Sequence, residues 1–529
     1  MSGPLRGIRV VDLGIMAAGP ATGAFLAQLG AEVVKVEPPA GDGTRWAHPT
    51  QNGMGTNFLA MNLGKKDVVL DLKTAEGRSA ALTLIRSADV LLQNMATGVA
   101  ERLGMGYDDL RPQNPRLVYC AISGYGRVGP LARDKGHDQA LQAISAFARL
   151  NGRAGDDLEH FRFTGLIDLV TAAVATNSIV AGLLDRVRTG EGQNISVSML
   201  EASLEVQFRN FNQFLADRVH PLPNGSASGV SVPDRAYRAS DGEIFLTVRD
   251  NEEWLRLCSA IGNESLSRDE RLRSREGRLA LRHRVDEAVQ SALAGQPAAY
   301  WLRVLAKAGV PAGKAWSIHD IEFNVQAIEN AMVSRIDTFA GPLTVGGVPW
   351  HFSRTPAAVQ PPPKPDQHTG DLDIIAGRWA GRERSPVSIE PGASDATLLD
   401  GCKVVELASG DAGALACLRL QDLGAEVIRV EFGDDAGPDR FLDRGKTLLH
   451  VANFPDLEAE LDRLIAGADI VVLANRRRFW EAIECVGSRR LQTREGQTPR
   501  LWVDITDFGP LGPLAGHEGS ELVIQAFAG

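Results

Sequence analysis

The sequence predicts an α/β protein. We expect a large domain on an open parallel sheet of the Rossmann-like type, a small inserted α+β domain, and a partial second Rossmann-like α/β copy. Residues 7–37 read as a strand, a small-residue turn, an amphipathic helix and a second strand. This pattern is typical of a βαβ unit with two parallel strands. Residues 401–431 repeat the pattern without a gap, whereas residues 225–318 interrupt the α/β texture.

The repeat is visible residue by residue. Each copy has a β-branched run followed by an acid, Asp12 in the first copy and Glu406 in the second. Both copies continue with a small-residue turn, the sequence Leu-Gly-Ala-Glu, and a second β run that ends in a carboxylate. The similarity continues through residues 75–94 and 115–143 of the first copy. The sequence therefore predicts two copies of one N-terminal α/β unit, the second of them incomplete.

Composition divides the rest of the chain. Residues 165–186 read as one long apolar helix, and the small domain combines short β pieces with charged helices, which is typical of an α+β domain. A Pro-rich stretch and then a polar stretch follow it, as in a surface tail and a linker. The predicted parts are the first part of the large domain at 1–224, the small domain at 225–318, a return segment at 319–375, a linker at 376–398 and the partial second copy at 399–529.

The overall composition excludes several classes of function. The 529 residues suffice for three or four domain-sized units, and 56 Lys and Arg against 66 Asp and Glu give a net charge of −10. We therefore expect no nucleic-acid surface and no membrane anchor. The five cysteines are scattered and odd in number, which argues against a disulfide framework or a metal site and for a cytoplasmic protein. The longest apolar runs fall well short of a membrane span.

Few motifs carry chemistry. The turn after the first strand reads GIMAAGPATG and contains neither a dinucleotide fingerprint nor a P-loop. We expect the ligand instead in the crevice at the carboxyl ends of the parallel strands. Asp168 stands there in an apolar helix, where an isolated acid is more often a structural group or a helix cap than a catalyst. His137 and Asp138 start another helix, and alone they read equally well as a surface residue and a cap.

These segments together resemble a known family. The segments LRGIRVVDL, AAGPATGAFLAQLGAEVVKVEPPAGDGTR, MNLGKKDVVLDLKTAEGR, GHDQALQA, TGEGQNISVSMLEA and PDQHTGDL occur in the order and spacing of the class III CoA-transferases, the CaiB/BaiF family. The resemblance covers residues 4–375, and the second copy resembles only the N-terminal third of the family. It implies acyl-CoA and a carboxylic acid as substrates, with no permanently bound cofactor, and an interlocked homodimer.

The resemblance also assigns residues. It makes Asp168 the nucleophile, because this aspartate lies in the helix before the segment 188–193. A carboxylate there can attack an acyl-CoA thioester and form first an aspartyl anhydride and then an aspartyl-CoA thioester. Lys73, Arg102 and Lys135 are the implied phosphate partners. The residues implied to contact CoA are Ala17, Ala18, Leu70, Asp71, Leu72, Lys73, Asn94, Met95, Ala96, Arg102, Lys135, Gly136 and Asp138.

The sequence departs from one branch of the family. Ala17 stands where the branch resembling formyl-CoA transferase has Gln, and Pro38 where it has Arg. The glycine loop of that branch is matched only loosely by residues 224–229. These departures argue against formate or oxalate as the substrate, and the sequence does not identify the acyl donor or acceptor.

Two other hypotheses stay open at this point. The pair His137 and Asp168 resembles the two bases of the α-methylacyl-CoA racemase branch, which would exchange a proton on the substrate's α-carbon. A third possibility, from a different functional class, is a non-catalytic CoA-binding or scaffold protein. We expect the second copy to be either a non-catalytic packing or CoA-binding module or a fragment of a longer tandem protein that stops before its second nucleophile. It has no counterpart of Asp168, and Ser520 and Glu518 replace His137 and Lys135.

Overall fold

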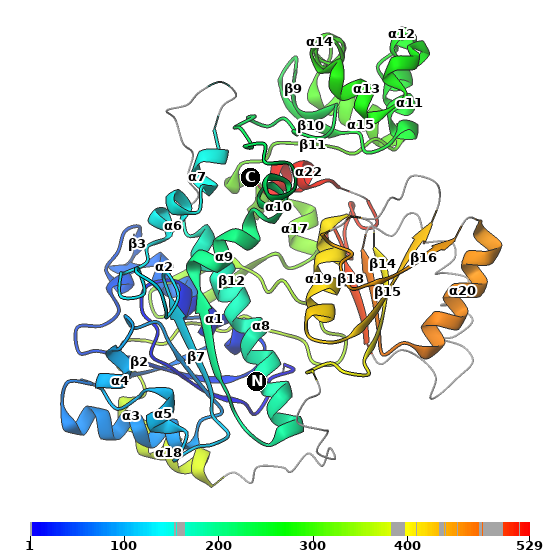
Figure 1. Ribbon diagram of the computed structural model, residues 1–529. Helices are drawn as coiled ribbons and strands as arrows, with labels where there is room; N and C mark the ends of the chain where they lie inside the picture. Colours follow the sequence, from blue (N-terminus) through cyan, green and yellow to red (C-terminus); the bar gives the residue numbers. More distant parts are fainter. Residues whose placement is uncertain are drawn as a thin grey trace. The chain divides into compact units, whose positions relative to one another are not determined.

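The computed structural model forms two compact units (Figure 1). The first unit comprises Met1–Pro223 and Ala331–Ser394, and the second comprises Asn224–Asn330 and Asp395–Gly529. Each unit is described by itself. The residues that the structure describes are 3–152, 155, 164–381, 397–408, 410–432, 439, 441–451, 453–474, 479, 501–517 and 519–528.

A parallel sheet of six strands is the centre of the first unit. Its strand order is β5-β2-β1-β6-β7-β8, and every neighbouring pair is parallel. The chain runs outward in one direction from β1 to β2 and in the other from β1 to β6, so the order reverses beside β1. The strands are β1 Arg9–Asp12, β2 Glu32–Glu37, β5 Lys66–Val69, β6 Val90–Gln93, β7 Val118–Ser123 and β8 Asn194–Ser198.

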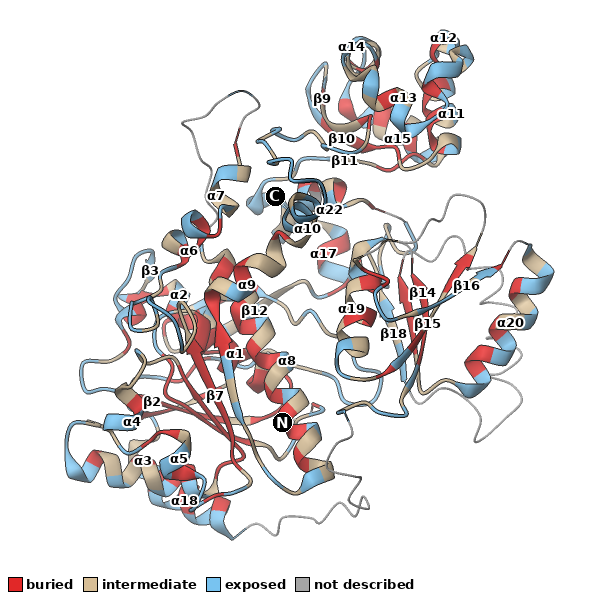
Figure 2. Cartoon of the chain, in the orientation of Figure 1, coloured by how far each residue is buried: buried red, intermediate tan, exposed pale blue. Residues whose placement is uncertain are grey.

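Helices cover both faces of this sheet, and the central strands are buried along almost their whole length (Figure 2). Successive strand residues point to opposite faces. Val10 packs in one cluster with Leu26 and Ile179, whereas Val11 packs in the other with Leu84 and Trp379. The helices of this part are α1 Ala18–Gln28, α2 Thr56–Met61, α3 Ala75–Ser87, α4 Val99–Arg102, α5 Tyr107–Leu110, α6 Asp138–Ile144, α7 Phe147–Leu150, α8 Leu166–Thr189, α9 Met199–Val206 and α10 Phe208–Asp217.

Helix α8 is long and apolar enough, by length and composition alone, to cross a membrane. The sequence contains no continuous apolar run of this length, because polar residues such as Asn177 interrupt the helix. In the structure α8 packs against α1, β7, β8 and α9, and Ile179 in its middle is fully buried. Its apolar face therefore forms part of the core of the first unit.

The last part of the first unit returns to the sheet. The hairpin of β12 (Val333–Thr338) and β13 (Gly341–Gly346) packs beside α2 and the short strands β3 (Thr50–Gln51) and β4 (Met54–Gly55). Helix α18, Leu372–Ala380, then packs on α3.

The predicted linker at 376–398 is wrong at its start, because helix α18 extends to Ala380. The side chain of Trp379 is buried, its ring N–H donates to Glu32 at 3.0 Å, and its carbonyl accepts from the Arg9 guanidinium at 2.6 Å. Residues 376–380 are thus part of the core, because a buried Trp and Ala face outweighs the polar composition that follows. Residues 382–396 of the predicted linker lie outside the described residues.

The inserted domain is an α+β domain, as the sequence predicts. An antiparallel sheet, β11-β10-β9, is covered by helices whose core includes Trp254, Val289 and Leu305. The predicted return to the large domain began at 319, whereas the second unit extends to Asn330 and includes α16 and α17. The elements are β9 Asp234–Ala239, β10 Gly242–Thr247, α11 Asn251–Ala260, α12 Glu264–Arg268, α13 Arg275–Ala280, α14 Arg282–Leu293, α15 Ala298–Ala308, β11 Ala312–Lys314, α16 Ile318–Glu322 and α17 Val325–Glu329.

The second-copy segment has its own parallel sheet with strand order β16-β15-β14-β17-β18. This order matches that of the first five strands of the first unit. Its helices α19 and α20 take the places of α1 and α3. The elements are β14 Lys403–Ala408, α19 Asp411–Asp422, β15 Glu426–Phe432, β16 Thr447–Val451, α20 Phe454–Gly467, β17 Ile470–Ala474, β18 Leu501–Ile505 and α22 Glu521–Ala528.

A buried ion pair is also duplicated. In the first copy the Lys65 ammonium donates to Asp12 at 2.8 Å and to the carbonyl of Pro20 at 2.7 Å. In the second copy Lys446 donates to Glu406 at 2.6 Å and to the carbonyl of Ala414 at 2.9 Å. The two copies therefore share both the fold and the buried lysine, which bonds to the acid of the first strand and to a carbonyl of the first helix.

Candidate active site

The site forms at the carboxyl edge of the first sheet. The implied CoA-contacting residues lie in the segments that follow β1, β5, β6 and β7, and the carboxyl ends of parallel strands meet at one edge. The turn between β1 and α1 lies beside the point where the strand order reverses. Open α/β sheets bind their ligands at this position.

Buried charges hold the turn before α1. The Lys35 ammonium donates to the carbonyl of Gly14 at 2.7 Å and to the carboxylate of Asp42 at 3.0 Å. The same carboxylate accepts the backbone N–H of Met16, which has a left-handed φ of 69°. Sequence reasoning missed Lys35, Asp42 and Lys65. The signal for Lys35 was a lysine within the β-branched run of β2, whereas Asp42 and Lys65 lie in loops and gave no such signal.

Asn94 lies against the same turn, as the resemblance implies for a CoA contact. Its side-chain amide accepts from the N–H of Ile15 at 3.0 Å and donates to the carbonyl of Ile15 at 2.8 Å. A Cβ at Gly19 would lie 3.2 Å from the Asn94 side chain, so the first turn of α1 and the loop after β6 are in close contact. Asn94 therefore fixes the backbone beside Ala17 and Ala18.

Asp168 is the third residue of α8. Gly165, in the left-handed conformation, precedes the helix and redirects the chain into it. Burial and the nearby Asp138 carboxylate raise the pKa of Asp168 to about 6. The backbone amide of Ala18, the first residue of α1, lies near the Asp168 carboxylate and opposes this rise by favouring the ionised form. The structure thus brings together the implied nucleophile and an implied CoA contact.

Asp138 caps α8 from another element. It is the first residue of α6, it is buried, and one carboxylate oxygen accepts the N–H of Ile167 at 2.8 Å and of Asp168 at 3.2 Å. The other oxygen accepts from the Gln142 side chain at 2.5 Å. A carboxylate is favourable at a helix N-terminus because the free N–H groups point to it. The structure therefore gives Asp138 a positioning contact to the backbone of Asp168.

His137 has a different place. Its side chain is exposed at the residue before α6, and among the described residues it has no hydrogen bond or ion pair to Asp168. The two-base hypothesis needs both groups to face one carbon atom. The contact to Asp168 comes from Asp138, so no observation here favours that hypothesis.

Two glycines bring the His137 segment to the end of β7. A Cβ on Gly136 would lie 2.4 Å from the Cα of Gly124, and a Cβ on Gly124 would lie 2.5 Å from the Cα of Gly136. No other residue fits such a backbone contact. Gly136 was implied as a CoA contact, whereas Gly124 was missed, although its place just after a β run could have indicated a close approach.

The three implied phosphate partners are exposed. Lys73 follows β5, Arg102 lies in α4 after β6, and Lys135 lies in the loop after β7. Within the described parts of the chain, none of the three has an acidic partner. Their charges are therefore available to an anionic ligand at this edge of the sheet.

The other implied contacts lie in the loops around them. Leu70, Leu72 and Met95 are half-buried and pack on the apolar core. Asp71 accepts the N–H of Lys73 at 2.9 Å and shapes the turn that presents this lysine. Ala96 precedes α4 and its carbonyl accepts the N–H of Val99. These residues position the loop backbone.

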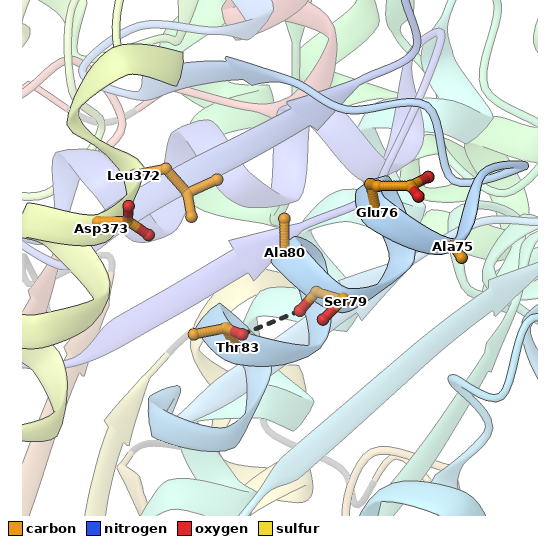
Figure 3. A pocket seen from close by; sticks show the side chains of 7 residues that line it. All are labelled: Ala75, Glu76, Ser79, Ala80, Thr83, Leu372 and Asp373. Atoms are coloured by element: carbon orange, nitrogen blue, oxygen red, sulfur yellow. Dashed lines mark hydrogen bonds between the residues drawn. The ribbon is translucent and has the colours of Figure 1, made fainter.

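A shallow pocket of the first unit lies elsewhere, between α3 and α18 (Figure 3). Its charged groups are the acids Glu76 and Asp373, which would repel an anionic ligand. It contains none of the candidate site residues and is not the active site. The lining residues are Ala75, Glu76, Ser79, Ala80, Thr83, Leu372 and Asp373.

The second copy has lost the features of the site. By the gapless repeat, Asp411 takes the place of Ala17 at the start of α19, so an acid stands where the first copy has a neutral turn. Ser520 replaces His137, and Glu518, which replaces Lys135, lies outside the described residues. An acid at this position opposes an anionic ligand.

Comparisons with known proteins agree with this geometry. The model of CoA-transferase family III matches residues 5–369 and 399–529, in two parts like the repeat. The succinyl-CoA:glutarate CoA-transferase of Mus musculus is 31% identical over 371 residues, 69% of this chain and 85% of that protein. The acetyl-CoA:oxalate CoA-transferase of Acetobacter aceti is 35% identical over 312 residues, 59% of this chain and 80% of that protein.

A solved structure is similar as well. A CAIB/BAIF family protein from Brucella suis has a TM-score of 0.63 and 29% sequence identity, and the match covers 71% of this chain and all of that chain, 100%. Residues 5–369, which match the family model, include Asp168, Asp138 and the turn before α1. The protein is an enzyme with CoA-transferase activity and belongs to CoA-transferase family III.

Proposed function

We propose that the enzyme moves CoA from an acyl-CoA donor to a carboxylic acid through covalent intermediates on Asp168. The Asp168 carboxylate attacks the thioester carbonyl carbon, a C–O bond forms, the C–S bond breaks, and CoA leaves as a thiolate. The thiolate then attacks the aspartyl carbonyl of the anhydride and releases the donor acid as a carboxylate. Asp168 now carries CoA as a thioester.

The acceptor reverses these steps. Its carboxylate attacks the aspartyl-CoA carbonyl, which gives a new anhydride and frees the thiolate. The thiolate attacks the acceptor's acyl carbon, the new acyl-CoA forms, and Asp168 returns as a carboxylate. No proton has to be added or removed at any of these steps. The residues act by holding the carboxylate and by stabilising the oxyanions that form at the carbonyl groups.

The contact between Asp168 and the N-terminus of α1 carries this proposal. The backbone amide of Ala18 lies near the Asp168 carboxylate and favours its charged form, and a pKa of about 6 leaves this carboxylate ionised at neutral pH. A carboxylate that is ionised, half-buried and more basic than usual is a stronger nucleophile than a solvated one. The proposal assigns the backbone N–H groups at the start of α1 to stabilise the oxyanion that forms when an acyl group is attached to Asp168.

Mass spectrometry of the intact protein tests the proposal. The full chain is incubated with a panel of acyl-CoAs, including succinyl-CoA and acetyl-CoA, then digested and searched for CoA or acyl adducts on the peptide containing Asp168. We expect an adduct in the wild-type chain and in the control variant Asp185→Asn, which changes an acid at the other end of α8. Asp168→Asn should show none.

Three results would contradict the proposal. The first is the absence of any adduct while CoA transfer proceeds. The second is exchange of the substrate's α-proton into deuterated water that is lost in His137→Ala, which would support the racemase hypothesis. The third is a chain that binds CoA but keeps all measurable function in Asp168→Ala, which would support a binding or scaffold role.

The remaining expectations belong to the same proposal. We propose that the donor is the CoA thioester of a small carboxylic acid and that the acceptor is another small carboxylic acid, because the relatives named above are a succinyl-CoA:glutarate and an acetyl-CoA:oxalate CoA-transferase. For residues 399–529 we propose a packing role rather than a catalytic one, because Asp411 and Ser520 stand where the first copy has Ala17 and His137. A homodimer and a cytoplasmic location stay predictions, which light scattering and cell fractionation test.

A further inference from the structure

Two amide side chains of the second unit hold a loop of the second copy. Gln326 in α17 donates from its amide to the carbonyl of Phe508 at 2.6 Å and of Leu511 at 2.5 Å, and its oxygen accepts the N–H of Leu514 at 2.6 Å. Asn330 donates to the carbonyl of Leu511 at 2.7 Å and accepts its N–H at 3.0 Å. We call Gln326 and Asn330 the amide socket.

The socket is buried and specific for backbone. Gln326 is 1% exposed and Asn330 is 2% exposed, and each of their side-chain amide groups is hydrogen-bonded. All hydrogen bonds from the socket to the loop go to main-chain groups, so the socket recognises the backbone conformation of the loop and not its side chains. Leu511 keeps its side chain 56% exposed even though its backbone is held. Side chains of the loop can therefore change without loss of these contacts.

Two glycines make that shape possible. A Cβ at Gly509 would lie 2.3 Å from the Asn330 oxygen, and a Cβ at Gly512 would lie 2.7 Å from the Gln326 oxygen. Both glycines also have left-handed φ values, 90° and 82°. The glycines are required by the socket as well as by the turn.

The first copy has the same loop. Gly126, Gly129, Pro130 and Leu131 correspond to Gly509, Gly512, Pro513 and Leu514 of the second copy. The φ values of Gly126 and Gly129 are 89° and 98°, close to those of their counterparts. The turn bonds also match: Ala132 donates to the Gly129 carbonyl in one copy, and Ala515 donates to the Gly512 carbonyl in the other.

In the first copy, the equivalent loop positions have no protein group packed against them among the described residues. Within the described residues, a Cβ at Gly126 or Gly129 would meet nothing within 4 Å. Val128 is 86% exposed, and across the described chain its backbone N–H and carbonyl have no protein partner. The first-copy loop thus has the same backbone conformation at its two glycines as the second-copy loop. It exposes the main-chain groups that correspond to those bound by the amide socket. It lacks the close contacts that make glycine necessary in the second copy.

We propose that loop Gly126–Leu131 is a docking surface for the amide socket of a second copy of this chain. The second copy's own loop, residues 509–514, competes for the same socket from within the chain. A tethered loop has a high effective concentration, so the internal loop holds the socket most of the time. The second copy then limits how strongly two chains associate through this contact.

Sedimentation equilibrium of the full chain tests the competition. Gly512→Ala puts a methyl group against Gln326 and weakens the internal loop, so self-association should tighten by about tenfold. Gly516→Ala is the matched control, because Gly516 has a φ of 75° but no neighbour within 4 Å. Gln326→Ala with Asn330→Ala removes the socket, so self-association should be weaker than in the wild-type chain and should not tighten when Gly512→Ala is added.

The first-copy loop is tested in the same way. Gly129→Ala should weaken self-association of the wild-type chain and of Gly512→Ala, whereas Gly104→Ala, with a φ of 69° and open space, should not. The wild-type comparison needs no change in the second copy, so it stays valid even if Gly512→Ala unfolds that part. Equal association of Gly129→Ala and Gly104→Ala overturns the proposal, as does an unchanged dissociation constant in folded Gly512→Ala. The experiment uses no substrate, so its outcome is independent of the catalytic proposal.

Discussion

The carboxylate of Asp138 accepts the backbone N–H of Asp168 at 3.2 Å and thereby joins the start of α6 to the start of α8. The same carboxylate raises the pKa of the Asp168 side chain, because two negative charges lie close together in a partly buried site. One acid therefore both fixes the backbone of the proposed nucleophile and makes its carboxylate more basic.

Asp138→Asn separates these two effects. The amide oxygen can still accept an N–H, but the negative charge is gone, so the pKa of Asp168 should fall from about 6. Since the nucleophile must be ionised, the acidic limb of the kcat/KM profile should move to lower pH. We expect kcat at neutral pH to fall about tenfold, because a less basic carboxylate is a weaker nucleophile. Asp108→Asn, an exposed acid of α5, is the control and should leave the profile unchanged.

Asp168→Asn should stabilise the protein in a pH-dependent way. The folded pKa of about 6 lies above the ordinary value of a free aspartate, so ionisation of Asp168 destabilises the folded state at pH above about 6. The variant removes that charge, and we expect its melting temperature to exceed the wild type by about 2–4 °C at pH 7.5. The difference should shrink as the pH falls through 6 toward about 4, where both states of the wild type bind the proton. A gain that is the same at pH 5 and pH 7.5 would exclude this explanation.

Gly23→Ala should destabilise the first unit. A Cβ there would lie 2.5 Å from the Asp12 carboxylate and 2.9 Å from the Lys65 ammonium, and this buried pair cannot move aside without losing its bonds. We expect a loss of about 2–4 kcal/mol of unfolding free energy in urea titrations. Gly377→Ala, on the exposed side of α18 with no neighbour within 4 Å, is the control and should be neutral or stabilising. A tolerated Gly23→Ala would show that the pair can shift.

Lys73→Ala, Arg102→Ala and Lys135→Ala should weaken binding of acyl-CoA rather than chemistry. Each removes one exposed positive charge at the carboxyl edge of the sheet, so KM for acyl-CoA should rise about fivefold while kcat stays within about twofold. Lys364→Ala, an exposed lysine elsewhere in the first unit, is the control. The rise in KM should diminish at high salt, since screening weakens exposed charge pairs. A fall in kcat without a change in KM would speak against a binding role.

The fold could be predicted because its signals are periodic. The runs around Val10 and Val404 alternate or stay buried as strands do, and the gapless repeat fixed the order of elements. The confirmed expectations include the family and the α/β architecture with its parallel sheets. The prediction of a linker was wrong at Trp379. The composition of residues 376–398 is polar on average, whereas the burial of Trp379 depends on contacts with Glu32 and Arg9 far away in the sequence.

The site was predictable only in part. Asp168 has no diagnostic neighbour in the sequence, and the family resemblance supplied its role. Lys35 and Asp42 were missed because a buried charge is recognised only when its partner is known, and that partner depends on the turn after β2. The pairing of Asp138 with the start of α8 spans a sequence separation of 30 residues and follows from the packing of α6 on α8.

The bond between Arg9 and the carbonyl of Trp379 joins positions 370 residues apart, at the two ends of the first unit. During synthesis, β1 leaves the ribosome long before α18 exists, and the whole inserted domain must emerge in between. The first unit therefore completes its core only after most of the chain has been made, which favours slow folding through long-range contacts. Until then the apolar patch of α3 that α18 covers stays open to solvent, so the nascent chain exposes a surface that favours aggregation for as long as the inserted domain is being made.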